Sequence, residues 1–175
     1  MAVSSIFLVG PMGAGKTTLG RLLADILNKT FVDSDRCIEE RAGANIPWIF
    51  DLEGESGFRD RETQVLDELT QQPDLVLATG GGAVVRAENR QMLASRGVVV
   101  YLRTRLDTQL ARTAKDKNRP LLQKNNPRAI LARLLAEREG HYEALADIVV
   151  DTDHGSPRAL ADYIVQEYRT HHENP

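Results

Sequence analysis

Residues 10–17 read Gly-Pro-Met-Gly-Ala-Gly-Lys-Thr, which fits the phosphate-binding pattern G-x-x-x-x-G-K-[ST]. Its three glycines let the backbone wrap round phosphate groups without Cβ clashes. Lys16 is expected to reach the β- and γ-phosphates of a nucleotide, and Thr17 to place its hydroxyl on Mg²⁺. An apolar run at 6–9 precedes the motif, and apolar residues at helical spacing follow it. The motif therefore predicts a strand–loop–helix unit whose helix N-terminus favours an anion, rather than a glycine-rich turn without a ligand.

An acidic pair follows at the end of the next predicted strand, where residues 33–35 read Asp-Ser-Asp. If strand geometry continues through them, alternation places the carboxylates of Asp33 and Asp35 on the same side. Paired acids beside a phosphate-binding loop could hold Mg²⁺ and accept a proton from an attacking hydroxyl. Asp and Ser are also favoured in turns at strand ends, so the pair alone does not decide between chemistry and turn structure.

Arg59 and Glu62 border the apolar face of a helix that is predicted to begin near Gly57. Their spacing allows an ion pair. The pair is either an ordinary surface contact or a device in which Glu62 directs the Arg59 fork towards an anionic substrate. Three nearby aromatic residues could wall the same pocket or lie in the core: Trp48, Phe50 and Phe58.

Two further segments have a composition that suits a ligand. Three consecutive glycines at 80–82 follow an apolar run, and they could either bring the backbone close to a ligand or form a flexible turn. Residues 112–119 contain four basic side chains against one acid. Such a stretch is either a solvated charge run or a lid that closes on phosphates and supplies a positive charge, and the phosphate-binding loop favours the lid.

Arg138 continues the apolar stripe of a predicted helix, which is set by Ile130, Leu131, Leu134 and Leu135. An arginine on the buried side of a helix requires an anionic partner, because an unpaired buried charge is costly. A neighbouring glutamate or the carboxylate of a ligand could be that partner.

The elements that must position these residues alternate along the chain. Strands are predicted at 6–9, 31–33, 75–78, 98–102 and 148–150, with helical patterns between them. Pro127 and Pro157 are predicted at first helical positions, after the N-caps Asn126 and Ser156. The alternation predicts an α/β protein with a parallel sheet covered on both faces. The polar segments follow the carboxyl ends of strands, where ligands bind in open α/β sheets.

Composition limits the class of protein. The chain has 175 residues, 42% hydrophobic and 27% charged, with a net charge of −3. These values predict one domain, 1–175, with no general attraction to nucleic acid or membranes. The one cysteine, Cys37, fits a reducing compartment, and no signal peptide or membrane-spanning run is recognised. We expect a cytoplasmic monomer.

Taken together, the motifs resemble those of the shikimate kinase family over nearly the whole chain. The matching stretches are GPMGAGKTT at 10–18, DSD at 33–35, FDLEGESGFRDRE at 50–62, TGGGAV at 79–84, NRPLL at 118–122, and ER with the following Tyr at 137–142. The resemblance implies the three-layer P-loop kinase fold, with five parallel strands in the order 2-3-1-4-5. It also implies a substrate-binding insertion at about 34–61 and a mobile lid at about 112–124.

This family transfers the γ-phosphoryl group of ATP to the 3-hydroxyl of shikimate, in the pathway to aromatic amino acids. By matching position, the residues implied to bind shikimate are Asp35, Arg59, Gly81 and Arg138. Those implied to bind ATP are Gly13, Ala14, Gly15, Lys16, Thr17, Thr18, Arg119 of the lid and, near adenine, Gly155. Thr17 and Asp33 are implied at Mg²⁺, and the implied catalytic residues are Lys16, Asp35 and Arg119.

Three other functions stay open at this point. A gluconate or nucleoside monophosphate kinase would share the fold, and gluconate also carries a carboxylate and hydroxyls. A GTP-dependent switch would use a D-x-x-G motif, which residues 51–54 match, but Phe31 stands where a guanine-reading acid after Asn28 and Lys29 is needed. An inactive binding module is the third alternative, although nothing that catalysis requires is missing.

Overall fold

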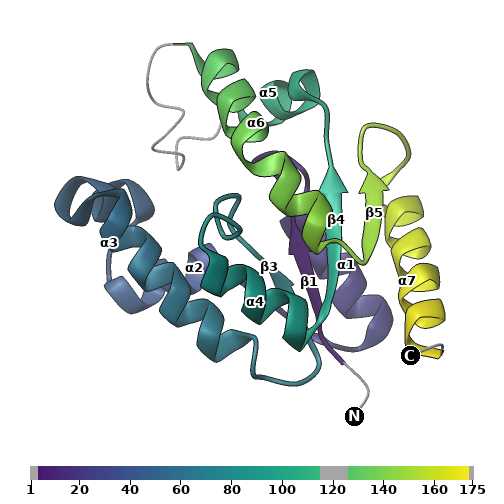
Figure 1. Cartoon of the computed structure of the whole chain (residues 1–175). Coiled ribbons are helices and arrows are strands. Elements are labelled where there is room, and N and C mark those ends of the chain that lie inside the picture. Colours follow the sequence, from purple (N-terminus) through teal and green to yellow (C-terminus); the bar gives the residue numbers. More distant parts are fainter. Residues whose placement is uncertain (1–3, 115–125, 174–175) are drawn as a thin grey trace.

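The computed structural model in Figure 1 describes residues 4–114 and 126–173. Five parallel strands form one sheet in the order β2-β3-β1-β4-β5. The strands are β1 Ile6–Val9, β2 Thr30–Asp33, β3 Leu75–Ala78, β4 Val98–Arg103 and β5 Ile148–Asp151. The predicted fold class and strand order are confirmed, and each predicted strand agrees to within one residue at either end.

Helices connect the strands and cover both faces of the sheet (Figure 1). They are α1 Lys16–Leu27, α2 Ser34–Ala42, α3 Ile46–Leu69, α4 Ala87–Arg96, α5 Leu106–Thr113, α6 Pro127–Leu145 and α7 Pro157–Glu173. The predicted starts of the last two are confirmed: Asn126 accepts the Ala129 N–H, and Ser156 accepts the Ala159 N–H. None of the described helices could cross a membrane.

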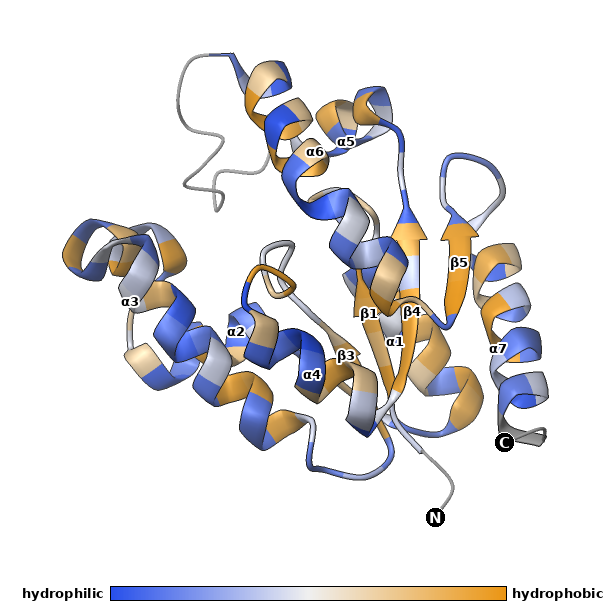
Figure 2. Ribbon diagram, in the orientation of Figure 1, coloured by the Kyte–Doolittle hydropathy of each residue, from blue (hydrophilic) through white to orange (hydrophobic). Residues whose placement is uncertain are grey.

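Alternation along β1 divides the core between the two faces of the sheet. Ile6 and Leu8 pack in a cluster with side chains of α1 and α7, whereas Phe7 and Val9 pack in a second cluster with side chains of α2, α3 and α4. Figure 2 shows the consequence, since β1 is hydrophobic throughout its length and β4 and β5 are mainly hydrophobic up to their carboxyl ends. A strand buried on both faces carries no polar residue, which is why these runs are recognisable in the sequence.

The segment between β2 and the middle of α3 is largely helical, although no particular helix was predicted there before Gly57. Residues 34–42 form α2, and α3 begins at Ile46 and is interrupted at Gly54, where φ is 73° and ψ is 178°. The prediction of a helix that begins near Gly57 is confirmed to within about two residues, because the second part of α3 begins directly after Gly54. Polar residues on the outer surfaces hid the pattern, while Ile38 and Ile49 supply the buried contacts.

Candidate active site

The phosphate-binding loop joins β1 to α1, as predicted. Gly13 and Gly15 have positive φ angles of 81° and 91°, which suit glycine. Space is limiting as well, because a Cβ added at Gly13 would lie 3.1 Å from the Gln109 carbonyl oxygen. Lys16 Nζ donates to the carbonyl oxygens of Gly10 and Pro11 at 2.6 and 2.9 Å. The ammonium group thus lies over the loop, where phosphate oxygens could replace the carbonyls.

Asp33 connects this loop to the start of α2. Its Oδ2 accepts a hydrogen bond from the Thr17 hydroxyl at 3.2 Å, which brings the two expected Mg²⁺ residues together. Its Oδ1 accepts the N–H groups of Asp35 and Arg36 and caps α2. The strand therefore ends at Asp33, so the condition under which Asp33 and Asp35 would share one side of a continuing strand is not met. An N-cap requires this change in backbone direction.

Asp35 lies in the first turn of α2 and packs against the glycine run. A Cβ added at Gly80 would lie 2.6 Å from Asp35 Oδ1. The neighbouring Ser34 hydroxyl accepts the Gly80 N–H at 3.2 Å, and Ser34 is fully buried. The first turn of α2 and the glycine run are thereby held together, with the Asp35 carboxylate at their junction.

Arg59 and Glu62 form a buried ion pair, not an ordinary surface contact. Arg59 Nη1 lies 2.9 Å from Glu62 Oε1, and the exposed fractions of the two side chains are 8% and 0%. Arg59 Nη2 also lies 3.4 Å from Glu55 Oε1. A Cβ added at Gly82 would overlap the end of the Arg59 guanidinium, so that glycine makes room for the arginine.

Arg138 points inwards, as its place on the apolar stripe of α6 predicts, and it is 6% exposed. Its Nη1 would lie 3.6 Å from a Cβ at Gly81. One turn further along α6, the Tyr142 hydroxyl donates to the Gly81 carbonyl oxygen at 2.6 Å. Burial raises the pKa of this phenol, so it remains a donor at neutral pH. Tyr142, which appears in the sequence only as the tyrosine of the family motif at 137–142, fixes the glycine run against α6.

A charged side chain lies beside each glycine of the run: Asp35 at Gly80, Arg138 at Gly81 and Arg59 at Gly82. Three side chains from α2, α3 and α6 meet at the turn that follows β3. Figure 1 shows this turn between α3 and α6. A carboxylate and two guanidinium groups round a backbone turn can bind a small molecule that carries both hydroxyls and an acid group.

A separate pocket of about 210 Å³ lies on the outer side of the phosphate-binding loop. It is lined by Ala14, Gly15, Thr18, Leu19, Arg112, Thr152, Gly155, Pro157 and Leu160. Arg112 spans it, donating to the Gly13 carbonyl at 2.9 Å and to the Thr152 carbonyl at 3.1 Å. The sequence grouped Arg112 with the lid, and nothing in its spacing marks it as the wall of this pocket.

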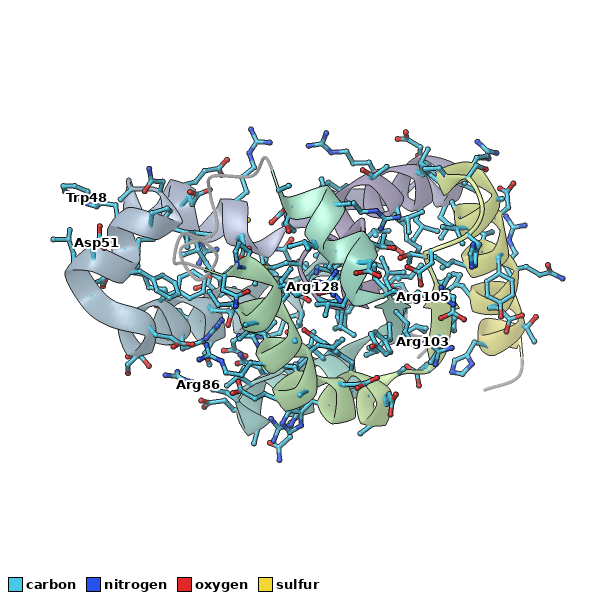
Figure 3. The ribbon with its side chains drawn as sticks, turned by 90° about the horizontal axis from the view of Figure 1, so that it is seen from above. Trp48, Asp51, Arg86, Arg103, Arg105 and Arg128 are labelled. Carbon is cyan, nitrogen blue, oxygen red and sulfur yellow. The ribbon has the colours of Figure 1, made fainter. Side chains whose placement is uncertain are left out.

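Two other expectations concern the rim of the site. Phe50 and Phe58 do lie together, with ring centroids 5.0 Å apart, but Trp48 is 56% exposed and does not wall a pocket. Figure 3 shows Trp48 and Asp51 at the outer end of α3, directed away from the molecule. Asp51 begins the D-x-x-G match, so its position argues against a GTP switch. Arg119 and most of the expected lid lie outside the described residues.

Comparison with known proteins decides the family. The family model described as "Shikimate kinase" matches residues 12–169. The chain belongs to the shikimate kinase family. A shikimate kinase of Psychrobacter arcticus is 60% identical over 93% of this chain and 88% of its own length. One from Vibrio parahaemolyticus is 59% identical over 93% of this chain and 94% of its own length.

Solved structures agree with this assignment. A shikimate kinase from Acinetobacter baumannii, determined in complex with shikimate, has a TM-score of 0.94 and 54% identity over 97% of this chain and 94% of its own. A gluconokinase from Sinorhizobium meliloti has a TM-score of 0.64 at 15% identity, with 98% and 95% coverage. The second likeness shows a common fold and nothing more.

Glu62 should make the stability of the fold depend on pH. Burial raises the pKa of its carboxyl to about 7 from an ordinary 4.5, although Arg59 acts in the opposite direction. The folded state therefore keeps this proton at a pH where the unfolded chain has lost it, and this contribution to stability falls as pH rises from 4.5 to 7. In the parent protein, the free energy of unfolding measured with urea should fall by roughly 1–3 kcal/mol between pH 5 and pH 7.5 because of Glu62. We expect this fall to be absent in Glu62→Gln.

Glu55→Gln is the matched control for that experiment, since Glu55 also contacts Arg59 but its side chain is 55% exposed. Its stability should follow the same pH curve as the parent protein. An unchanged slope in Glu62→Gln would show that Glu62 ionises normally.

Gly82→Ala should weaken the use of the acceptor substrate without affecting the nucleotide. The added Cβ displaces the Arg59 guanidinium, and a displacement of this kind can cost up to about a hundredfold in rate. We expect a rise of roughly tenfold in the KM for shikimate, with the KM for ATP unchanged. Gly140→Ala is the control, because a Cβ there would meet nothing within 4 Å. Equal kinetics in both variants would mean that Arg59 does not depend on Gly82.

Proposed function

We propose that this chain phosphorylates shikimate with ATP at the turn formed by residues 80–82, beside the phosphate-binding loop. The observation that supports the proposal most strongly is the convergence of Asp35, Arg59 and Arg138 on that turn. The reaction yields shikimate 3-phosphate and ADP. It serves aromatic amino-acid biosynthesis.

The acceptor substrate fits the charges of the site. Shikimate carries one carboxylate and three hydroxyls. Arg59 and Arg138 clamp the carboxylate with their planar forks, Asp35 accepts hydrogen bonds from hydroxyls, and the backbone at Gly81 approaches the ring closely. The Acinetobacter relative was determined with shikimate bound, which supports this choice of ligand.

ATP binds on the other side of the phosphate-binding loop. The backbone N–H groups from Gly13 to Thr18 and the Lys16 ammonium hold its phosphates. The base enters the pocket beside Arg112 and Gly155, where Gly155 offers only its backbone. Arg119, in the lid, adds positive charge to the transferring group.

Mg²⁺ would be held by the Thr17 hydroxyl and, directly or through water, by the Asp33 carboxylate. These residues fit the ion, because the two oxygens already lie 3.2 Å apart next to the loop. Mg²⁺ usually binds through one or two protein oxygens together with phosphates and water. When bound, it neutralises charge on the β- and γ-phosphates.

Phosphoryl transfer depends mainly on position and charge. Arg59 and Arg138 fix the ring so that its 3-hydroxyl points at the γ-phosphate. Asp35 orients that hydroxyl and accepts its proton as the new bond forms. Lys16 and Arg119 oppose the negative charge on the phosphoryl oxygens. The enzyme acts as a single-domain monomer in the cytoplasm, where both small-molecule substrates are available.

Arg138→Leu tests the carboxylate contact. Loss of one member of a desolvated ion pair costs about 2–5 kcal/mol, so the Kd for shikimate should rise by roughly thirtyfold or more. The rise should largely vanish for an analogue whose carboxylate is a neutral carboxamide. Binding is measured for both proteins with both ligands by calorimetry.

Arg133→Leu is the control for helix stability and net charge, because Arg133 lies on α6 with its side chain 64% exposed. It should bind both ligands like the parent protein. Additive effects of Arg138→Leu and of carboxylate removal would show that the two groups do not meet.

A further inference from the structure

A small cavity lies behind Arg138, between the phosphate-binding loop, α5 and α6. Its volume, measured as the space open to the centre of a water molecule, is about 10 Å³. Its lining residues are Pro11, Met12, Gln109, Leu131, Leu134, Leu135, Arg138 and Tyr142. Roughly 10–15 Å³ of such space suffices for one water molecule, provided that polar groups surround it.

Two of the lining side chains have a buried atom without a hydrogen-bond partner among the described residues. They are Gln109, through Oε1, and Arg138, through Nε. The exposed fractions of these residues are 1% and 6%. One is an acceptor and the other a donor, and each costs free energy if it stays unsatisfied in the interior.

The orientation of the Gln109 amide is fixed from its other end. Its Nε2 donates to the Thr104 carbonyl oxygen at 2.9 Å, so Oε1 is directed away from that carbonyl. Tyr142 donates its proton to the Gly81 carbonyl and has a side-chain hydrogen bond with Arg138, and the remaining lone pair of its oxygen can accept one more hydrogen bond. The cavity thus has one donor and two acceptors on its walls.

We propose that one ordered water molecule occupies this cavity, accepts a hydrogen bond from Arg138 Nε, and donates to Gln109 Oε1 and to the Tyr142 oxygen. Three partners are the usual number for a buried water. Gln109 is then a positioning residue for Arg138. This role rests on the proposed function, in which Arg138 binds the carboxylate of shikimate.

The water would fix the inner edge of the guanidinium and leave its two Nη groups for the substrate. An arginine that is held at Nε loses less side-chain freedom when it binds, which favours affinity. The main chain of Gln109 also packs against the nucleotide loop, because a Cβ added at Gly13 would lie 3.1 Å from the main-chain carbonyl oxygen of Gln109. The same residue therefore contacts the nucleotide loop and supports the substrate arginine.

The first test is a high-resolution crystal structure of the full chain without ligands. A water peak within hydrogen-bond distance of Arg138 Nε, Gln109 Oε1 and the Tyr142 oxygen is the expected result. A dry cavity, or one closed by a different rotamer of Arg138, would overturn the proposal. This outcome does not depend on which substrate the enzyme uses.

The second test is Gln109→Met, which keeps the length of the side chain and removes the acceptor. The Kd for shikimate should rise on the order of tenfold, and the Kd for ATP should stay the same. For the carboxamide analogue the change should be small, because Arg138 no longer meets a charge. Equal losses for shikimate and the analogue would mean that Gln109 only supports the fold through Thr104, and the positioning role would be rejected.

The two proposals fail in different ways. If Arg138→Leu and carboxylate removal are additive, the carboxylate contact is wrong whatever the cavity contains. If that cycle shows coupling but the cavity is dry, the proposed function stands and the water does not.

Discussion

Asp35→Asn should lower kcat with shikimate by about 10³- to 10⁴-fold, while ATP still binds. Asparagine has the same size, so the contact with Gly80 survives. It has no negative charge, however, and it cannot take the proton of the attacking hydroxyl. The change also removes an acid from the first turn of α2, which should cost no more than about 1 kcal/mol of stability.

Turnover is measured at saturating ATP and shikimate, and ATP binding by calorimetry. Asp51→Asn is the control, because Asp51 is an exposed acid at the outer end of α3 (Figure 3). It should retain full activity. If Asp35→Asn retained most of its turnover, the carboxylate would belong to the helix start and not to the chemistry.

Lys16→Ala should reduce kcat/KM for ATP by at least about a thousandfold, because a preorganised positive charge on the phosphoryl oxygens is lost. The fold should survive, since Lys16 Nζ lies over the carbonyls of Gly10 and Pro11 and not in the apolar core. The melting temperature should therefore change little.

Arg21→Ala removes an equal charge from an exposed position on the same helix and serves as the control. Its kcat/KM for ATP should match that of the parent protein. Near-normal activity in Lys16→Ala, with an unchanged melting temperature, would refute the phosphate role.

The strands could be predicted because parallel strands buried on both faces are continuous apolar runs. Ile6–Val9 and Leu75–Ala78 match the prediction at both ends. Their order in the sheet came only from the family resemblance. Helices with polar outer faces were harder: α2 was missed because its buried side is represented by few residues, with Ile38 the main apolar one.

The site was partly predictable from local spacing. Arg138 follows from a helical stripe, and the pairing of Arg59 with Glu62 follows from a separation of three residues. Contacts between distant segments could not be predicted in this way. The close approach of Arg59 to Gly82, the bond from Tyr142 to Gly81 and the place of Arg112 each depend on how elements far apart in sequence pack.

The helix cap at Asp33 shows a different limit. The turn interpretation of the acidic pair is confirmed at Asp33, which caps α2 with one oxygen, while its other oxygen accepts the Thr17 hydroxyl and its role at Mg²⁺ stays a prediction. A periodic pattern assigns a residue to one helix or strand. It cannot show that one carboxylate both caps α2 and bonds to the phosphate-binding loop. Trp48 was predicted either to wall a pocket or to lie in the core, and it is exposed at the outer end of α3. The local sequence does not distinguish an exposed aromatic residue from one in a pocket.

We propose that the cluster of Asp35, Arg59 and Arg138 round the turn at 80–82 selects shikimate as the phosphoryl acceptor. The test is ADP release by the wild-type enzyme, measured with ATP and Mg²⁺ and with shikimate, gluconate or AMP offered separately. We expect release above the background hydrolysis rate with shikimate alone, and a product that carries phosphate on the 3-hydroxyl. Faster release with gluconate or AMP than with shikimate would contradict the claim.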